Sequence, residues 1–267
     1  MGDWESDEFM SDWDKTYVST NVKPGSRSYD KDFFLGLRSS FQDQPPLESI
    51  SDAIIATACC AVGRADVVGR FFDDITHDLS PEESQAIFLR LRESITFVFP
   101  YLGIPTCIPA CYGMIGVVKR KGWEFASTER LRGRMISVDD AKRGRELRTS
   151  VYRNVGNSEI FGLMDTYFTD LFMCSTVVTW GYLLARANEK LFQIHESHLV
   201  VAATIMALGA TRQTKSHIKA TLGLGSSVQS VKAVMNVVGQ ISDWADRPLV
   251  DFDVDELAGQ VQQGVGR

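Results

Sequence analysis

Three consecutive blocks of apolar and polar residues stand out toward the carboxyl end of the chain. Residues 199–208 are almost entirely apolar and are followed by Gly209, and a polar block then runs to Gly223 and Gly225. A third block starts at Ser226 and carries apolar residues at helical spacing, namely Val228, Val231, Val234, Met235 and Val238. This pattern predicts three successive helices, and the first should be buried because it is apolar on all sides.

The polar middle helix carries the residue best suited to chemistry. Helical spacing puts Gln213, His217 and Ala220 on one face. An imidazole against a buried helix can give or take a proton near neutral pH. The alternative is a core histidine bonded to a backbone carbonyl. His217 is therefore the first candidate for an acid–base group.

A similar order of blocks occurs earlier in the chain. Residues 52–62 are apolar and end at Gly63, residues 64–75 predict a second helix, and Ser80-Pro81-Glu82-Glu83 is a capping box that starts a third. An offset of 146 residues carries Gly63 onto Gly209 and Ser80 onto Ser226. These agreements predict an all-α protein built from two related helical repeats. The same offset places Phe71 at the position of His217, so the first repeat lacks the histidine.

The repeats predict five parts of the chain, and two of them leave alternatives open. They are an acidic tail or arm (1–28), a first repeat (29–118), a basic connector (119–155), a second repeat (156–255) and a flexible carboxyl-terminal tail (256–267). The acidic part favours a solvated tail, but its aromatic residues at near-helical spacing also fit an arm that packs on its own domain or on a neighbouring subunit. The connector is either solvated and internally ion-paired or a cationic rim for a carboxylated substrate.

Composition narrows the class of protein. The chain has 267 residues, 44% of them hydrophobic, a net charge of −6 and an isoelectric point near 5.3. An acidic balance disfavours general nucleic-acid binding, and no apolar run reaches the ~20 residues of a membrane span. Five cysteines without scaffold spacing indicate free thiols. A soluble cytoplasmic protein without nucleic-acid or membrane partners is the expectation.

The carboxyl-terminal blocks resemble the carboxymuconolactone decarboxylase and alkylhydroperoxidase (AhpD-like) family. The resemblance rests on the order of short motifs: Trp180-Gly181, residues 186–191, Ala207-Leu208-Gly209, Ser216-His217 and Gly225-Ser226. It implies an AhpD-like helical bundle, a homo-oligomer, and a histidine at position 217 that acts as an acid–base group or in a thiol relay.

The chain departs from the peroxidase branch of that family. The branch's Cys-x-x-Cys pair would fall at Ala210 and Gln213, and its acidic residue would fall at His198, with Glu196 two residues earlier. A thiolate is needed to attack peroxide and a second thiol to resolve the product. Thiol peroxidase activity is therefore the least favoured function, and it would have to use Cys107 or Cys111.

The residues and the resemblance together suggest a cofactor-independent lyase or isomerase. It would act on a small carboxylated, lactone or keto-acid substrate, with a buried imidazolium stabilising an enolate. The expected catalytic residues are His217, His198 and Glu196, and the expected substrate-binding residues are Gln213, Trp180, Arg186 and Arg148. No metal is expected, although His195 and His198 have a spacing that zinc accepts. The alternative is a non-catalytic small-molecule-binding or assembly protein of the same fold.

Overall fold

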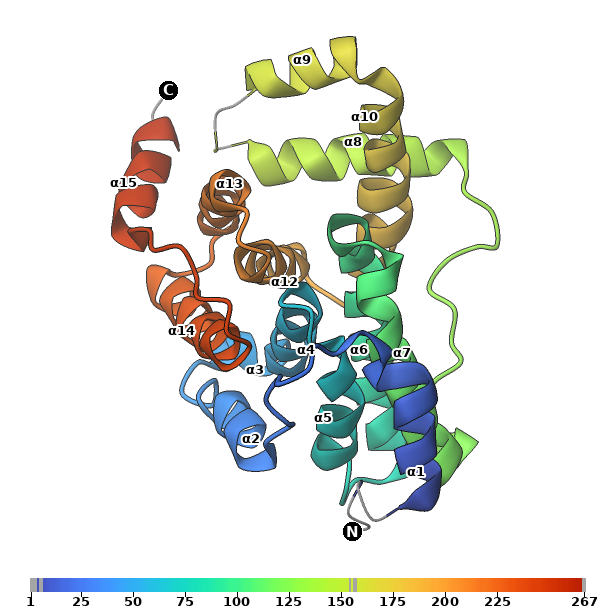
Figure 1. Ribbon diagram of the computed structural model, residues 1–267. Coiled ribbons are helices and arrows are strands. Elements are labelled where there is room, and N and C mark those ends of the chain that lie inside the picture. The colour runs from blue at the N-terminus through green and yellow to red at the C-terminus, as the bar shows by residue number, and fades with distance from the viewer. Residues whose placement is uncertain (1–3, 5–6, 154, 156–157, 266–267) are drawn as a thin grey trace. The chain divides into compact units, whose positions relative to one another are not determined.

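The computed structural model describes residues 4, 7–153, 155 and 158–265 (Figure 1). Every secondary-structure element among these residues is helical, so the predicted all-α class is confirmed. The elements before residue 130 are α1 (Glu8–Trp13), η1 (Asp14–Val18), η2 (Ser19–Asn21), α2 (Lys31–Ser39), α3 (Pro45–Glu48), α4 (Ser51–Ala61), η3 (Ala65–Val67), α5 (Val68–Ile75), α6 (Pro81–Leu102), α7 (Ile104–Lys121) and η4 (Trp123–Phe125). Those after it are α8 (Val138–Tyr152), α9 (Ser158–Tyr167), α10 (Thr169–Cys174), η5 (Ser175–Ala185), α11 (Arg186–Asn188), α12 (Ile194–Ala207), α13 (Thr211–Gly223), α14 (Val228–Trp244) and α15 (Val254–Val265).

The chain forms two compact units that interleave along the sequence. Unit 1 comprises residues 1–129, 203–210 and 233–250, and unit 2 comprises residues 130–202, 211–232 and 251–267. The five-part linear division expected from the sequence remains a prediction, because these units are defined by contacts.

Unit 1 is built around the buried helix α4 and a close crossing of α5 and α7. Ten of the eleven α4 residues are buried, as expected for its apolar sequence. A Cβ atom on Gly69 of α5 would lie 2.6 Å from the Cα atom of Gly113 on α7. Larger residues at either position would force the two backbones apart, so the glycine pair sets this packing.

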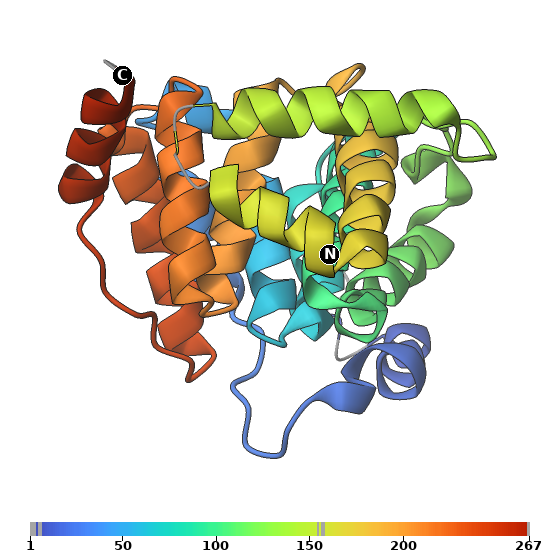
Figure 2. The same ribbon diagram turned by 90° about the horizontal axis from the view of Figure 1, so that it is seen from above.

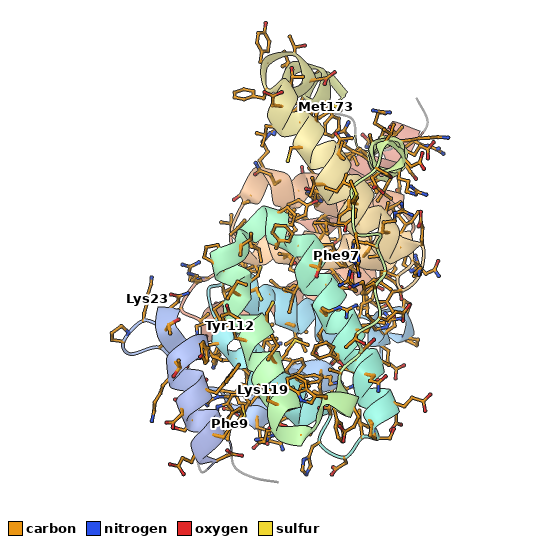
Figure 3. All side chains as sticks on the ribbon, turned by 90° about the vertical axis from the view of Figure 1, so that its right-hand side faces the viewer. Phe9, Lys23, Phe97, Tyr112, Lys119 and Met173 are labelled. Atoms are coloured by element: carbon orange, nitrogen blue, oxygen red, sulfur yellow. The ribbon has the colours of Figure 1, made fainter. Side chains whose placement is uncertain are left out.

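The amino-terminal residues that the structure describes pack on α7 within unit 1 as an arm, so the favoured prediction of a solvated tail is wrong for them. The Trp13 indole Nε1 donates to the Tyr112 carbonyl at 2.8 Å, and its ring lies where Gly116 has no side chain. Lys119 lies 4.6 Å above the Trp13 ring, close to Phe9 and Tyr112 (Figure 3). These contacts of Trp13 hold the arm on α7 although acidic residues flank it.

Unit 2 contains a second close crossing, between α8 and the helix that α10 and η5 form together (Figure 1 and Figure 2). A Cβ atom on Gly144 would overlap the Thr176 carbonyl oxygen, and one on Gly181 would overlap the Asp140 carbonyl oxygen. η5 is a π-helix of eleven residues. π-helical segments are rare in proteins, and those that occur often lie at functional sites. This crossing is therefore a candidate location for chemistry.

The carboxyl-terminal residues also correct an expectation. Residues 254–265 form α15, in place of the flexible tail predicted for 256–267. Val254, Leu257 and Val261 are buried, and α15 packs on α13 within unit 2. Their spacing of three and four residues gives one apolar face, which holds the helix in place.

Local features of the two predicted repeats agree in part. Gly63 and Gly209 both have φ near +80°, a backbone conformation that favours glycine. The capping box of α6 is confirmed, since the Ser80 N–H donates to Glu83 Oε2 at 2.9 Å. In the later segment the capping residue is Ser227, whose hydroxyl accepts from the Ser230 N–H at 2.9 Å, one position after the expected Ser226. The duplication itself remains a prediction.

Candidate active site

Four aromatic side chains of unit 2 form a buried group that we call the histidine cluster: Tyr152, Trp180, His198 and His217. The rings of His198 and His217 stack with centroids 5.1 Å apart and planes tilted by 21°. The Tyr152 hydroxyl lies 3.1 Å from His217 Nε2. The Trp180 ring stacks on the His198 ring, with centroids 6.2 Å apart. The cluster therefore places one phenol and two imidazoles within contact of one another.

Each member of the cluster comes from a different helix. Tyr152 is the last residue of α8, Trp180 lies in the π-helix η5, and the two histidines lie on α12 and α13. The close crossing of α8 and η5 fixes Tyr152 beside Trp180, with ring centroids 5.7 Å apart. Trp180 directly precedes Gly181, so the backbone contact at that glycine positions the indole.

His198 is the most unusual residue of the cluster. It is 0% exposed, and neither ring nitrogen has a hydrogen-bond partner among the described residues. A neutral imidazole has one donor and one acceptor nitrogen, and leaving a buried polar group unbonded costs about 1–3 kcal/mol. Native proteins retain few such groups, and catalytic or ligand-binding roles are among the reasons they do. The two nitrogens therefore keep unused hydrogen-bonding capacity inside the fold.

Burial makes both imidazoles neutral at physiological pH. It lowers the pKa of His217 to about 4. Burial, reinforced by His217, holds the pKa of His198 well below its usual range. Desolvation therefore disfavours the charged form of both rings in this state, and the stabilisation of an enolate by a buried imidazolium stays a prediction.

The phenol of the cluster is also uncharged. Burial raises the pKa of Tyr152, and the nearby Arg148 guanidinium offsets only part of that rise. Because the phenol keeps its proton and His217 is neutral, we take the Tyr152 hydroxyl to donate to Nε2. The pair can pass a proton over one short hydrogen bond.

Arg148 brings a positive charge to the edge of the cluster. Its Nη1 donates to the Thr176 hydroxyl at 2.6 Å. Its guanidinium lies 4.0 Å over the Phe172 ring and 5.6 Å over the Phe161 ring, and Phe161 in turn packs on Tyr152. These contacts hold the guanidinium one turn of α8 before Tyr152, where it can attract an anionic group.

Three of the expected site residues lie outside the cluster. Glu196 Oε2 accepts from the Gln193 N–H at 2.7 Å, which caps α12. Gln213 is exposed although it precedes His217 by one turn. Arg186 pairs with Asp140 at 3.0 Å and Glu189 at 3.3 Å. Glu196 and Arg186 thus have structural roles and Gln213 faces solvent, whereas His217, His198 and Trp180 do meet.

Two features of this region escaped the sequence analysis. Tyr152 lies in the basic connector, and the signal that could have drawn attention to it is a tyrosine one helical turn after Arg148. The second feature is a hollow of about 390 Å³ on α13, lined by the cations Arg212, Lys215 and Lys219 with Thr211 and Ser216. It gives the helix that carries His217 a positive outer face.

The alternatives that rest on metals or thiols gain nothing from the geometry. His195 is exposed while His198 is buried, so the two do not face a common ligand. No group of three or more histidine, cysteine or acidic side chains suited to a metal occurs among the residues described. Cys107 is 3% exposed and a hydrogen bond from Cys60 lowers its pKa, whereas burial raises the pKa of Cys111 to about 11. Neither thiol therefore combines a lowered pKa with the exposure that a peroxidase thiolate needs.

Comparison of the chain with protein-family models, with curated proteins and with solved structures finds no match. Taken singly, none of the helices in the described ranges combines the length and apolar character needed to cross a membrane. The pair 159–167 and 169–188, bent by 116°, meets that measure only when joined. The chemistry of the histidine cluster is therefore the structural feature from which a function can be inferred.

Proposed function

We propose that this chain is an enzyme that transfers a proton on a small carboxylated, lactone or keto-acid substrate. The observation that carries the proposal is His198, a fully buried imidazole with two unbonded nitrogens, stacked on a His217 that is hydrogen-bonded to Tyr152. The resemblance to carboxymuconolactone decarboxylases suggests a lyase or an isomerase as the reaction class.

The roles follow from the neutral state of the groups. Tyr152 would take the proton from the carbon next to the substrate carbonyl while its own hydroxyl proton passes to His217 Nε2 over the 3.1 Å contact, and the reverse of both transfers would return a proton to carbon. A neutral N–H of His198 would donate to the carbonyl oxygen as negative charge develops on it. A neutral imidazole can serve this electrophilic role because its N–H can donate a hydrogen bond to the carbonyl oxygen without the ring being charged. Arg148 would attract the carboxylate.

Proton exchange in D₂O tests the proposal without knowledge of the product. A panel of small keto acids, lactones and their carboxylated derivatives is incubated with the protein, and loss of the proton next to the carbonyl is followed by ¹H NMR. Tyr152→Phe and His217→Gln should each slow exchange by roughly a hundredfold or more. Tyr182→Phe is the matched control, because the Tyr182 hydroxyl donates to the Gly133 carbonyl outside the cluster. Equal exchange in all four proteins would refute the proposal.

A second candidate is a non-catalytic small-molecule-binding or assembly protein. It is favoured by the enclosure of the cluster, since neither the hollow on α13 nor a second hollow in unit 1 is lined by His198 or His217. It is also favoured by exposed apolar side chains of α9 and α10, including Leu163, Tyr167 and Leu171, which suit contact with a second copy. Ligand binding without proton exchange, together with a dimer or larger assembly in sedimentation, would select this candidate.

A further inference from the structure

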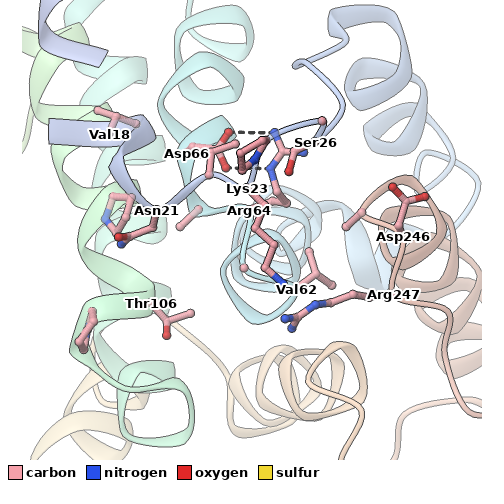
Figure 4. A pocket seen from close by; sticks show the side chains of 18 residues that line it. Val18, Asn21, Lys23, Ser26, Val62, Arg64, Asp66, Thr106, Asp246 and Arg247 are labelled. Carbon is pink, nitrogen blue, oxygen red and sulfur yellow. Dashed lines mark hydrogen bonds and ion pairs between the residues drawn. The ribbon is translucent and has the colours of Figure 1, made fainter. Parts of the chain in front are cut away.

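Unit 1 contains a hollow that is larger than the one on α13, and no residue of the histidine cluster lines it. Its volume is about 600 Å³, within the range of pockets that hold small organic ligands. Four segments of unit 1 line it: residues 18–26, 62–66, 105–109 and 245–247 (Figure 4). We call it the Arg247 pocket.

One wall of the Arg247 pocket is a fixed ion pair with no net charge. The Arg64 guanidinium makes two hydrogen bonds of 2.9 Å to the Asp66 carboxylate, drawn as dashed lines in Figure 4. It also lies 4.3 Å over the Trp244 ring and is only 6% exposed. Arg64 and Asp66 therefore neutralise each other and form a fixed wall.

The remaining charges leave the pocket positive. Asp246 pairs with Arg27 at 3.3 Å, and in Figure 4 its carboxylate points away from the Arg247 guanidinium. Lys23 and Arg247 are exposed, and neither side chain has an acidic partner within the described residues. Two cations in a concave wall concentrate positive potential there, even though the whole chain carries a net charge of −6.

Apolar groups make up much of the rest of the lining. They include Val62, Pro105, Pro109 and Ala245. A ligand that suits both parts has an anionic head and an apolar body. From these observations we propose that the Arg247 pocket binds a small organic anion, a carboxylate or phosphate monoester with an apolar body, whose head group meets Lys23 and Arg247.

Isothermal titration calorimetry of the full chain at low ionic strength tests this assignment. The probes are phenyl phosphate and benzoate, which share an apolar ring and differ in the anionic head. Benzyl alcohol lacks the charge and inorganic phosphate lacks the body. At least one of the two aromatic anions should bind, and benzyl alcohol and inorganic phosphate should bind at least tenfold more weakly. The better of the two anions identifies the head group that the pocket prefers.

Two variants locate the bound probe. Arg247→Ala and Lys23→Ala should each weaken binding by roughly tenfold, the effect of losing one charge-assisted hydrogen bond. Both positions are exposed, so circular dichroism should show unchanged helix content. Lys142→Ala is the matched control, because it removes the same charge from an exposed position of unit 2. It should leave the affinity unchanged.

The outcomes separate this pocket from the histidine cluster. Affinity that is unchanged in His217→Gln agrees with the proposal, whatever the fate of the proposed enzyme activity. Binding that is lost in His217→Gln and retained in Arg247→Ala would place the probe elsewhere and overturn the proposal. The absence of binding by both aromatic anions, or equal binding of inorganic phosphate, would also overturn it.

Discussion

Two buried polar groups, one in each unit, are built in opposite ways. In unit 1, Asp73 is 5% exposed and its carboxylate contacts Arg120 at 2.5 Å and Lys121 at 3.7 Å. Lys121 also donates to the Thr76 carbonyl at 3.0 Å. We call these four residues the Asp73 cluster. In unit 2, His198 is more deeply buried, and its ring nitrogens have no such partners among the described residues.

The difference separates polar burial that builds the fold from polar burial that costs stability. A buried charge is tolerated when opposite charges and hydrogen bonds compensate its desolvation. The Asp73 cluster meets this condition through its two ion pairs, although Asp73 Oδ1 accepts no hydrogen bond among the described residues, and it ties α5 to α7. The histidine cluster pays for two unbonded nitrogens and gains no fold contact from them, which is the pattern expected of groups kept for a ligand.

The largest expected effect is on the Asp73 cluster. Asp73→Ala removes the shared partner of Arg120 and Lys121, so the free energy of unfolding should fall by about 4 kcal/mol. Urea denaturation followed by circular dichroism measures it. Asp255→Ala, which breaks an exposed pair with Lys232, should change stability by less than about 0.5 kcal/mol. Equal effects of the two variants would remove the structural role assigned to Asp73.

The next effect concerns the crossing that positions Tyr152 and Trp180. Gly144→Ala adds a Cβ atom that overlaps the Thr176 carbonyl, so the helices must separate, and stability should fall by about 3 kcal/mol. Gly162→Ala on α9 is the control, because no atom lies within 4 Å of the added Cβ. There alanine should stabilise the helix by up to about 1 kcal/mol. If Gly144→Ala were as stable as wild type, the close crossing would be incorrect.

A pH dependence should distinguish the histidine cluster from the rest of the chain. Folding lowers the pKa of His217 from 6.5 to about 4, so between these pH values the unfolded chain binds a proton that the folded chain does not. Stability is therefore lost as pH falls from 6.5 toward 4. At pH 5 the loss should be about 2 kcal/mol greater in wild type than in His217→Gln. The exposed His195 supplies the control, since His195→Gln should follow wild type; parallel curves for all three proteins would contradict the assignment.

The smallest expected effect is a gain in the free energy of unfolding, whereas Asp73→Ala and Gly144→Ala are expected to lower it. His198→Leu replaces two unbonded nitrogens with an apolar side chain of similar size, so stability should rise by about 1 kcal/mol. Thr57→Val on α4 is the matched variant from unit 1, where the hydroxyl donates to the Ala53 carbonyl at 2.8 Å. That change should lower stability by about 1 kcal/mol. A loss of stability in both variants would mean that His198 supports the fold.

The features that sequence could predict are those set within a few residues. The Ser80–Glu83 capping box spans four positions, and the buried helices α4 and α12 follow from unbroken apolar runs. The all-α class follows from these local patterns. His217 is indicated by helical spacing that places an imidazole beside a buried helix, whereas His198 is indicated by short motifs that resemble a family.

Other features depend on contacts that no local pattern contains. Tyr152 meets His217 across 65 residues, and Trp13 meets Tyr112 across 99. The acids around Trp13 indicate a solvated tail unless the receiving surface on α7 is known. Gln213 and His217 share a helix face by spacing, but the edge of the buried surface falls between them. The sequence does contain the pattern that predicts α15, since Val254, Leu257 and Val261 follow helical spacing.

A thermal-shift screen tests most directly whether His198 is kept for a ligand. A thermal-shift screen with small organic acids, keto acids and lactones is run on wild type and on His198→Leu in parallel. A compound that binds only the folded state stabilises it by about 2.7 kcal/mol at a hundredfold excess over Kd. If His198 binds a ligand, at least one compound should raise the melting temperature of wild type and not that of His198→Leu, although the variant is at least as stable on its own. Equal shifts in both proteins, or no shift across the panel, would contradict it.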